Sequence, residues 1–108
     1  MAAIQELDDR NFREGIHEGV TLVDFWATWC APCRLQEPAV ARVADAAGPR
    51  AKVAKVNVDN AEQTAAALGI QAIPTLIIFK DGQPVREFVG LAAEEELKSA
   101  LDEVLATA

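Results

Sequence analysis

The chain has 108 residues, of which 51% are apolar and 25% charged, and its formal net charge is -7. This composition is typical of one globular domain, here residues 1–108, and its negative charge argues against nucleic acid and membranes as partners, because both are anionic. The first twelve residues lack the basic and apolar parts of a secretory signal, and no apolar run approaches the ~20 residues of a transmembrane helix.

Strand-like and helix-like patterns alternate along the chain. In chain order we expect a strand at 3–7, a helix at 8–18, a strand at 20–26, a helix at 32–48, a strand at 51–59, a helix at 60–69, a hairpin at 75–90 and a helix at 92–106. Strands separated by helices indicate a parallel sheet with helices on both faces, and the hairpin adds an antiparallel edge. The fold class is therefore α/β, with a central mixed five-stranded sheet in the order βαβαβαββα.

Local signals support several of these elements. Asp8 and Asp9 are expected to cap the first helix and Asn60 the third, because their side chains accept bonds from free N–H groups. The dipeptide Asp81–Gly82 favours a tight hairpin turn. The second helix is expected to bury a stripe of apolar residues, namely Leu35, Ala39, Val43 and Ala46.

The strand at 20–26, "VTLVDFW", is apolar except for Thr21 and Asp24. Its continuous run of β-forming residues predicts a strand that is covered on both faces. A carboxylate among apolar neighbours is costly unless it is paired or protonated, so the pKa of Asp24 should be raised. Asp24 is therefore a candidate proton acceptor near the end of this strand.

The chain's two cysteines, Cys30 and Cys33, follow this strand and begin the second helix. Chemistry in open α/β sheets collects at the carboxyl ends of the strands, and a helix N-terminus stabilises a thiolate. Pro32 stiffens the ring between the two thiols, and Arg34 adds a positive charge beside them. The pattern predicts a dithiol that cycles to a disulfide by thiol–disulfide exchange.

Two other uses of the cysteines are less consistent with the sequence. A structural staple between residues three apart would constrain the unfolded chain little. A structural zinc site needs four nitrogen or sulfur ligands, and the chain has one histidine, His17, which we expect to be a solvated helix residue. We therefore expect no metal site.

The chain resembles the thioredoxin family over essentially its whole length. The resemblance rests on "VDFWATWCAPC" at 23–33, "VAKVNVDN" at 53–60, "GIQAIPTLIIFKDG" at 69–82 and "FVG" at 88–90. It implies the thioredoxin fold and the activity of a protein-disulfide reductase, or dithiol electron carrier. It also implies disulfide-bearing target proteins, recycling by thioredoxin reductase, a monomeric cytoplasmic protein, and no cofactor beyond the Cys30–Cys33 disulfide.

The resemblance also assigns roles to single residues. Cys30 would be the exposed attacking thiol and Cys33 the buried resolving thiol, with Asp24 accepting the proton of Cys33 and Lys55 lying near Asp24. The Ile73–Pro74 bond would be cis and would face the disulfide. A flat apolar surface for docking targets would consist of Trp29, Ala72, Ile73, Pro74, Gly90 and Leu91.

Some positions depart from the family pattern. The active-site dipeptide is Ala31–Pro32, whereas thioredoxins most often have Gly-Pro, so the reduction potential could be shifted. Two alternatives stay open at this point: an enzyme of the same fold that oxidises or isomerises disulfides, and a binding module whose redox chemistry is incidental. A leader and a more polar dipeptide would favour the first alternative, and the joint presence of both cysteines and Asp24 counts against the second.

Overall fold

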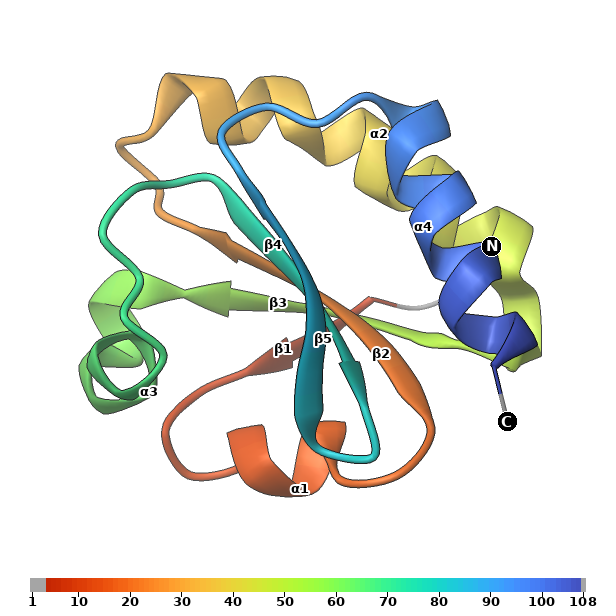
Figure 1. The fold of residues 1–108 in the computed structure, drawn as a ribbon. Coiled ribbons are helices and arrows are strands. Elements are labelled where there is room, and N and C mark those ends of the chain that lie inside the picture. Colours follow the sequence, from red (N-terminus) through yellow and green to blue (C-terminus); the bar gives the residue numbers. More distant parts are fainter. Residues whose placement is uncertain (1–3, 108) are drawn as a thin grey trace.

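A computed structural model describes residues 4–107 of the chain (Figure 1). In chain order its elements are β1 (Gln5–Leu7), α1 (Phe12–Ile16), β2 (Val20–Trp26), α2 (Ala31–Ala47), η1 (Gly48–Arg50), β3 (Lys52–Asn57), η2 (Val58–Asn60), α3 (Glu62–Ala67), β4 (Thr75–Lys80), β5 (Gln83–Val89) and α4 (Glu94–Ala106). The predicted order of strands and helices is confirmed. Residue 3 of the predicted first strand, and the ends of the predicted domain at 1–3 and 108, lie outside the described residues.

The five strands form one mixed sheet in the order β1-β3-β2-β4-β5. Strands β1, β3 and β2 run parallel, whereas β4 is antiparallel to β2 and β5 is antiparallel to β4. The expectation that helix-separated strands run parallel is therefore wrong for β4. The six residues of α3 span only about 9 Å, roughly half the length of β3, so this helix does not carry the chain back to the end of the sheet where β3 began.

Helices cover both faces of the sheet, as predicted, and each face has its own core. Helices α2 and α4 lie over one face and α1 and α3 over the other (Figure 1). The first core joins Val40, Val43, Leu97 and Leu101 of the helices to Leu22 and Ile78 of the sheet. The second core joins Phe12 and Ile16 of α1 to Val23, Phe25, Ile77 and Phe79 of the sheet. Strand β2 contributes to both cores, which explains why it is apolar on both faces except at Thr21 and Asp24.

The predicted inner face of α2 is partly wrong. Leu35 is 72% exposed and Ala46 is also exposed, whereas Val43 is buried as expected. The buried residues of this helix are Cys33, Gln36, Val40, Val43, Ala44 and Ala47. The buried face of α2 includes a polar residue, Gln36. A prediction based on apolar residues alone therefore assigned the buried face partly to the wrong side of the helix.

The caps of two helices also differ from expectation. Helix α1 is shorter than predicted, and Asp8 closes the turn before it by accepting the backbone N–H of Arg10. Asn60 does not cap α3. Instead, Asp9 accepts the backbone N–H groups of Gln63 and Thr64 and the hydroxyl of Thr64. A side chain more than fifty residues away in sequence thus satisfies the first turn of α3.

The predicted hairpin turn is confirmed. Asp81 and Gly82 have φ values of 50° and 86°, the left-handed conformations that a two-residue turn between antiparallel strands requires. The Asp81 carboxylate also accepts the backbone N–H of Gly19 at 2.8 Å. The turn of the hairpin is thereby tied to the start of β2.

Candidate active site

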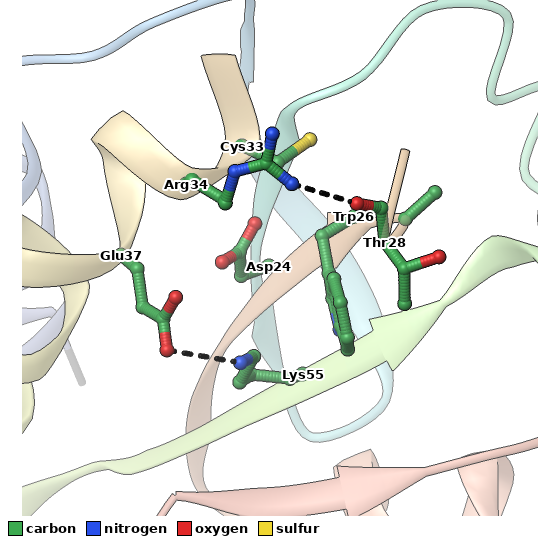
Figure 2. Close-up of a pocket in the computed structure, with 8 residues that line it drawn as sticks. Asp24, Trp26, Thr28, Cys33, Arg34, Glu37 and Lys55 are labelled. Carbon is green, nitrogen blue, oxygen red and sulfur yellow. Dashed lines mark hydrogen bonds and ion pairs between the residues drawn. The ribbon is translucent and has the colours of Figure 1, made fainter. Parts of the chain in front are cut away.

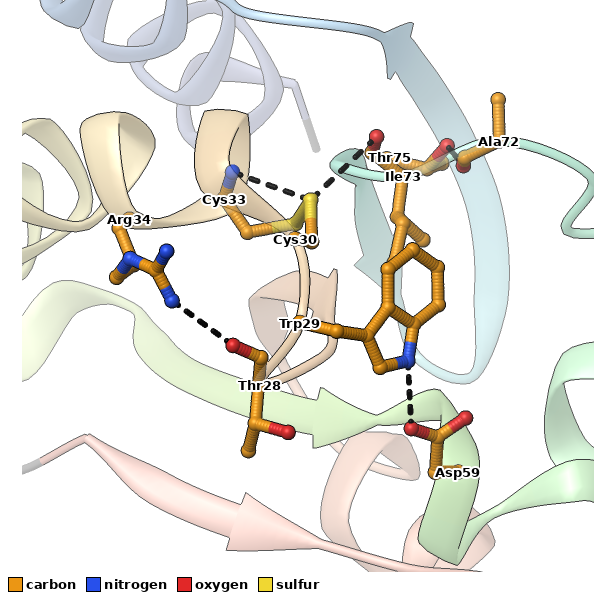
Figure 3. The surroundings of a disulfide bond; sticks show 9 residues. All are labelled: Thr28, Trp29, Cys30, Cys33, Arg34, Asp59, Ala72, Ile73 and Thr75. Atoms are coloured by element: carbon orange, nitrogen blue, oxygen red, sulfur yellow. Dashed lines mark hydrogen bonds between the residues drawn. A yellow bond between two sulfur atoms is a disulfide. The ribbon is translucent and has the colours of Figure 1, made fainter.

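The two cysteines lie where β2 ends and α2 begins, and they form a disulfide (Figure 3). Cys30 is the N-cap residue of α2, and its Sγ accepts the backbone N–H of Cys33 at 3.2 Å. The free N–H groups and the positive dipole end of the helix favour negative charge at this position. Of the two sulfurs, that of Cys30 is therefore the one that lies where the helix favours negative charge.

Burial does not separate the two cysteines. Cys30 and Cys33 are each 4% exposed, so the expectation that Cys30 is exposed is wrong for the disulfide form. Both pack against Ala27, and Ile73 lies against the same cluster. The carbonyl oxygen of Ile73 is 3.8 Å from Cys30 Sγ, which means that the segment before Pro74 covers the disulfide.

The Ile73–Pro74 peptide bond is cis, as the family resemblance implied. The carbonyl of Pro74 accepts the backbone N–H of Gly90 at 2.8 Å, and this bond brings two distant loops together beside the disulfide. Both loops contribute residues that were expected to dock targets, and Ile73 in the first loop lies against Cys30.

Five of the six residues expected to dock targets reach the surface. Trp29 and Leu91 are 66% and 59% exposed, Ala72 is exposed, and Ile73 and Gly90 are partly exposed. Pro74 is buried, so its expected place on this surface is wrong. Its carbonyl is bonded to the neighbouring loop, and its ring lies beneath the surface rather than on it.

Trp29 is held by a residue that the sequence analysis missed. Its indole Nε1 donates a 2.8 Å hydrogen bond to the Asp59 carboxylate in η2 (Figure 3). The bond fixes the orientation of a large exposed ring, which would otherwise be free to rotate. Asp59 lies thirty residues from Trp29 in sequence, and no local pattern links the two.

Asp24 is buried in the middle of β2, with only 1% of its surface exposed. Its Oδ1 has no hydrogen-bond partner within the described part of the chain. Desolvation raises the pKa of Asp24 from 3.8 to about 6, against the opposing effect of the Lys55 charge and with a further raising effect from Glu37. The expected direction of this pKa shift is therefore found.

Lys55 is the register partner of Asp24 on β3, so the two residues are neighbours, as expected. The Lys55 ammonium nevertheless pairs with another acid: its Nζ lies 3.6 Å from Oε1 of Glu37 on α2 (Figure 2). The same Nζ lies 4.4 Å from the centroid of the Trp26 ring. Glu37 was not predicted as a site residue from the sequence, although its position one helical turn after Cys33 could have indicated it.

A pocket of about 270 Å³ connects these groups to one of the two cysteines. Its lining residues are Asp24, Trp26, Ala27, Thr28, Cys33, Arg34, Glu37 and Lys55. Cys33 lines the pocket and Cys30 does not, so Asp24 shares a pocket with the second thiol of the pair. Arg34 lies at its edge, where Nη1 donates to the carbonyl oxygen of Thr28 at 2.9 Å (Figure 2).

Gln36 ties α2 to the loop that carries Leu91. Its side chain, 1% exposed, donates to the carbonyl of Ala92 at 2.9 Å and accepts the N–H of Ala92 at 2.8 Å. The two bonds satisfy both backbone groups of Ala92 in a buried place, where an unpaired group would cost free energy. The position of Leu91 is therefore tied to the helix that begins at the cysteines.

His17 is exposed at the end of α1, as expected for a solvated residue. Within residues 4–107, no three or more His, Cys, Asp or Glu side chains gather in a group that could hold a metal ion. None of the helices that these residues form is both long and apolar enough to cross a membrane.

The fold and the paired thiols at a helix N-terminus define a dithiol–disulfide oxidoreductase of the C-x-x-C type. The sequence profile of the family described as Thioredoxin matches residues 3–103. Thioredoxins of Staphylococcus haemolyticus and Alicyclobacillus acidocaldarius are 46% and 43% identical to the chain, each over 95% of this chain and 99% of the relative. The crystal structure of Malassezia sympodialis thioredoxin (Mala s 13) superposes with a TM-score of 0.87 at 34% identity, covering 98% of this chain and 94% of that one.

The chain belongs to the thioredoxin family. Its function is that of a protein-disulfide oxidoreductase, which reduces disulfides through the redox-active pair Cys30 and Cys33. Family membership implies disulfide-bearing proteins as targets and thioredoxin reductase as the source of electrons.

Proposed function

We propose that the two cysteines have different roles in this reaction, with Cys30 as the attacking thiol and Cys33 as the resolving thiol. The observation that supports this most strongly is the bond from the Cys33 N–H to Cys30 Sγ at the N-cap of α2. In the reduced protein this bond and the helix dipole would favour the thiolate of Cys30. The equal burial of the two cysteines in the disulfide form does not distinguish them.

The reaction then proceeds in two exchanges. The Cys30 thiolate attacks one sulfur of the target disulfide, forms a mixed disulfide, and displaces the other target sulfur as a thiolate. Cys33 loses its proton and attacks Cys30 Sγ, which forms the Cys30–Cys33 disulfide and releases the second target thiolate. Two electrons pass from the dithiol to the target, and the protons of the dithiol balance the two thiols that the target gains.

Asp24 is the proton acceptor for Cys33 in this proposal. Both residues line the same pocket, and a carboxyl with a pKa of about 6 can accept and return a proton near neutral pH. Lys55 lines the pocket as well and acts on Asp24 through its charge. A water molecule in the pocket would be able to carry the proton between the two groups.

Targets would dock on the exposed side chains of Trp29 and Leu91 and on the backbone of Ala72 and Ile73, with Gly90 leaving room for the incoming chain. Pro74 would support this surface from beneath, and Ala31 and Pro32 would hold the short ring between the thiols. Ile73 of this surface lies against Cys30, and large exposed apolar groups such as Trp29 and Leu91 favour contact with another protein.

We also infer that residues 1–108 form one domain, which works as a monomer in the cytoplasm without a bound cofactor. The Cα radius of gyration is 12.5 Å, against the roughly 13 Å expected of a single compact domain of this length. The relatives at 43% and 46% identity are bacterial thioredoxins of matching length.

A trapping experiment tests the two cysteine roles. Incubated with a disulfide-bearing protein, Cys33→Ser should accumulate a mixed disulfide through Cys30, because attack proceeds and resolution cannot. Cys30→Ser should form no such adduct and should reduce no disulfide. Non-reducing electrophoresis with mass spectrometry measures the adducts. Stable adducts on Cys30→Ser, with none on Cys33→Ser, would reverse the assignment.

A further inference from the structure

The pocket between β2, β3 and α2 holds one buried acid and two other charges that act on it. Asp24 comes from β2, Lys55 from β3 and Glu37 from α2. On the other side of Asp24, its register partner on β4 is the apolar Leu76, which does not line the pocket. Arg34 also lines the pocket from α2, but its guanidinium is bonded to a backbone carbonyl. Lys55 is therefore a cation that shares the pocket with two carboxylates, those of Asp24 and Glu37 (Figure 2).

The strand register would let Lys55 pair with Asp24. The two residues are direct partners across β2 and β3, and neighbouring strands lie only about 4.8 Å apart. In the structure, however, the carboxylate within ion-pairing distance of Lys55 is that of Glu37, at 3.6 Å, and Asp24 Oδ1 keeps no partner among residues 4–107. The Trp26 ring, 4.4 Å from Nζ, supports the ammonium in this position.

We propose that Glu37 is a positioning residue of this site, whose carboxylate holds the Lys55 ammonium towards α2 and so prevents it from pairing with Asp24. The Lys55 side chain is 21% exposed, so its charge is screened less than that of a surface lysine, whereas the side chain of Glu37 is 59% exposed. Removing the Glu37 charge would release this ammonium to the neighbouring carboxylate of Asp24.

Both consequences of Glu37 act on Asp24 in the same direction. The negative charge of Glu37 disfavours a second negative charge on Asp24. By pairing with Lys55, Glu37 also reduces the stabilisation that the ammonium would give to an ionised Asp24. Glu37 therefore keeps Asp24 protonated to higher pH. In the proposed function, on which this consequence rests, Asp24 could then both accept a proton from Cys33 and return it when the disulfide is reduced again.

The direct test is the titration of Asp24 by NMR of its carboxyl carbon in the wild type and in Glu37→Gln, both in the oxidised form. The midpoint should fall by at least about 0.3 pH unit in the variant, which is a twofold change in the ratio of ionised to protonated Asp24. The matched control is Glu103→Gln, which removes one negative charge and one surface ion pair, with Arg86, outside the pocket. Its midpoint should match the wild type.

The same titration in Lys55→Gln distinguishes two effects of Glu37 on Asp24: the effect through the position of Lys55 and the direct electrostatic effect of its own charge. If Glu37 acts through Lys55, Glu37→Gln should shift the Asp24 midpoint by less in the Lys55→Gln background than in the wild-type background. An unchanged midpoint in Glu37→Gln, or an equal shift with and without Lys55, would overturn the proposal.

The rate of mixed-disulfide resolution against pH then tests the link to catalysis. In Glu37→Gln the rise of this rate with pH should move to lower pH by the same amount as the Asp24 midpoint. If the Asp24 midpoint moves and the rate profile does not, the positioning role of Glu37 stands and Asp24 is not the proton acceptor.

Discussion

Asp24 is a buried acid whose pKa should affect stability and, in the proposed function, activity as well. Its pKa in the folded protein is about 6, above its ordinary value of 3.8, because desolvation disfavours the charged form. The native state thus binds this proton more tightly than the unfolded chain does. The resulting stabilisation is present below pH 3.8 and is lost as the pH rises through about 6, so that above this range the ionised acid opposes folding.

Replacing Asp24 with asparagine should therefore stabilise the protein at pH 8. A shift of about two pKa units corresponds to at most about 3 kcal/mol, so we expect Asp24→Asn to gain on the order of 1–3 kcal/mol over the wild type. At pH 3.5 most of this gain should vanish, because the wild-type carboxyl is then neutral in the folded state and mostly neutral in the unfolded chain. Denaturant unfolding at the two pH values measures the difference.

The same variant should resolve mixed disulfides more slowly at neutral pH, because Cys33 loses its proposed proton acceptor. The control is Asp102→Asn, which changes a half-exposed acid paired with Arg50 and should alter neither quantity much. A variant that is no more stable at pH 8 and resolves at the wild-type rate would contradict both the raised pKa and the catalytic role. Greater stability together with slower resolution is expected of an acid that is retained for function.

At the scale of elements, two helices depend on side chains from elsewhere in the chain. Helix α3 is capped by Asp9, and the hydrogen bonds from Thr64 lower the pKa of Asp9. Helix α2 is joined to the loop before α4 by the two bonds between Gln36 and Ala92. Both contacts join segments more than fifty residues apart, and the second lies next to Leu91, which is proposed to bind targets.

Asp9→Ala should loosen α3 and lower the stability of the protein. The variant leaves the first N–H groups of this six-residue helix without their acceptor, and so short a helix has little stability of its own. Amide hydrogen exchange should become faster in α3, and the midpoint of denaturant unfolding should fall. Since a lowered folded pKa stabilises above the unfolded value, the deficit should shrink as the pH falls through the folded pKa of Asp9.

Asn60→Ala is the matched control for this prediction. The sequence favoured Asn60 as the cap of α3, but in the structure α3 begins after Ala61 and takes its acceptor from Asp9. This variant should therefore leave the exchange rates of α3 unchanged. If Asn60→Ala loosens α3 more than Asp9→Ala does, the local cap is the effective one.

At the scale of the whole molecule, the reduction potential decides what the protein does in a cell. A reductase function requires a reduction potential near that of thioredoxin, about -270 mV. Disulfide isomerases and oxidases have reduction potentials of about -180 and -120 mV. Ala31 is the first residue of α2 and is exposed, so its effect on the two redox forms should be small. The departure from Gly-Pro should therefore leave the protein among the reductases.

We expect the Cys30–Cys33 couple to lie within about 20 mV of the thioredoxin value, and Ala31→Gly to move it by no more than about 20 mV. Alanine stabilises a helix interior over glycine by about 1 kcal/mol and a first turn by less, and about 1.4 kcal/mol corresponds to 30 mV for two electrons. Equilibration with glutathione or dithiothreitol buffers measures both values. A potential above about -200 mV would instead favour the oxidase or isomerase alternative.

Much of the fold was predictable because its signals are local. Three such features depend only on residues that are close together in sequence: the mostly apolar run of β2, the turn at Asp81–Gly82, and the position of Cys30 at the start of a helix. Side-chain periodicity and backbone hydrogen bonding act over this same short range, so the sequence by itself determined the order of the elements and the class of chemistry. The burial of Asp24 followed as well, because its immediate neighbours are apolar.

Only the tertiary structure decided how these elements meet. The direction of β4, the cap from Asp9, the partner of Lys55 and the covering of Cys30 by Ile73 all involve residues that are distant in sequence. Such contacts form when packing brings two segments together, and the hydrogen-bonding and charged groups then pair with whatever lies closest. The strand register places Lys55 beside Asp24, and the position of α2 over the sheet brings Glu37 within 3.6 Å of its ammonium.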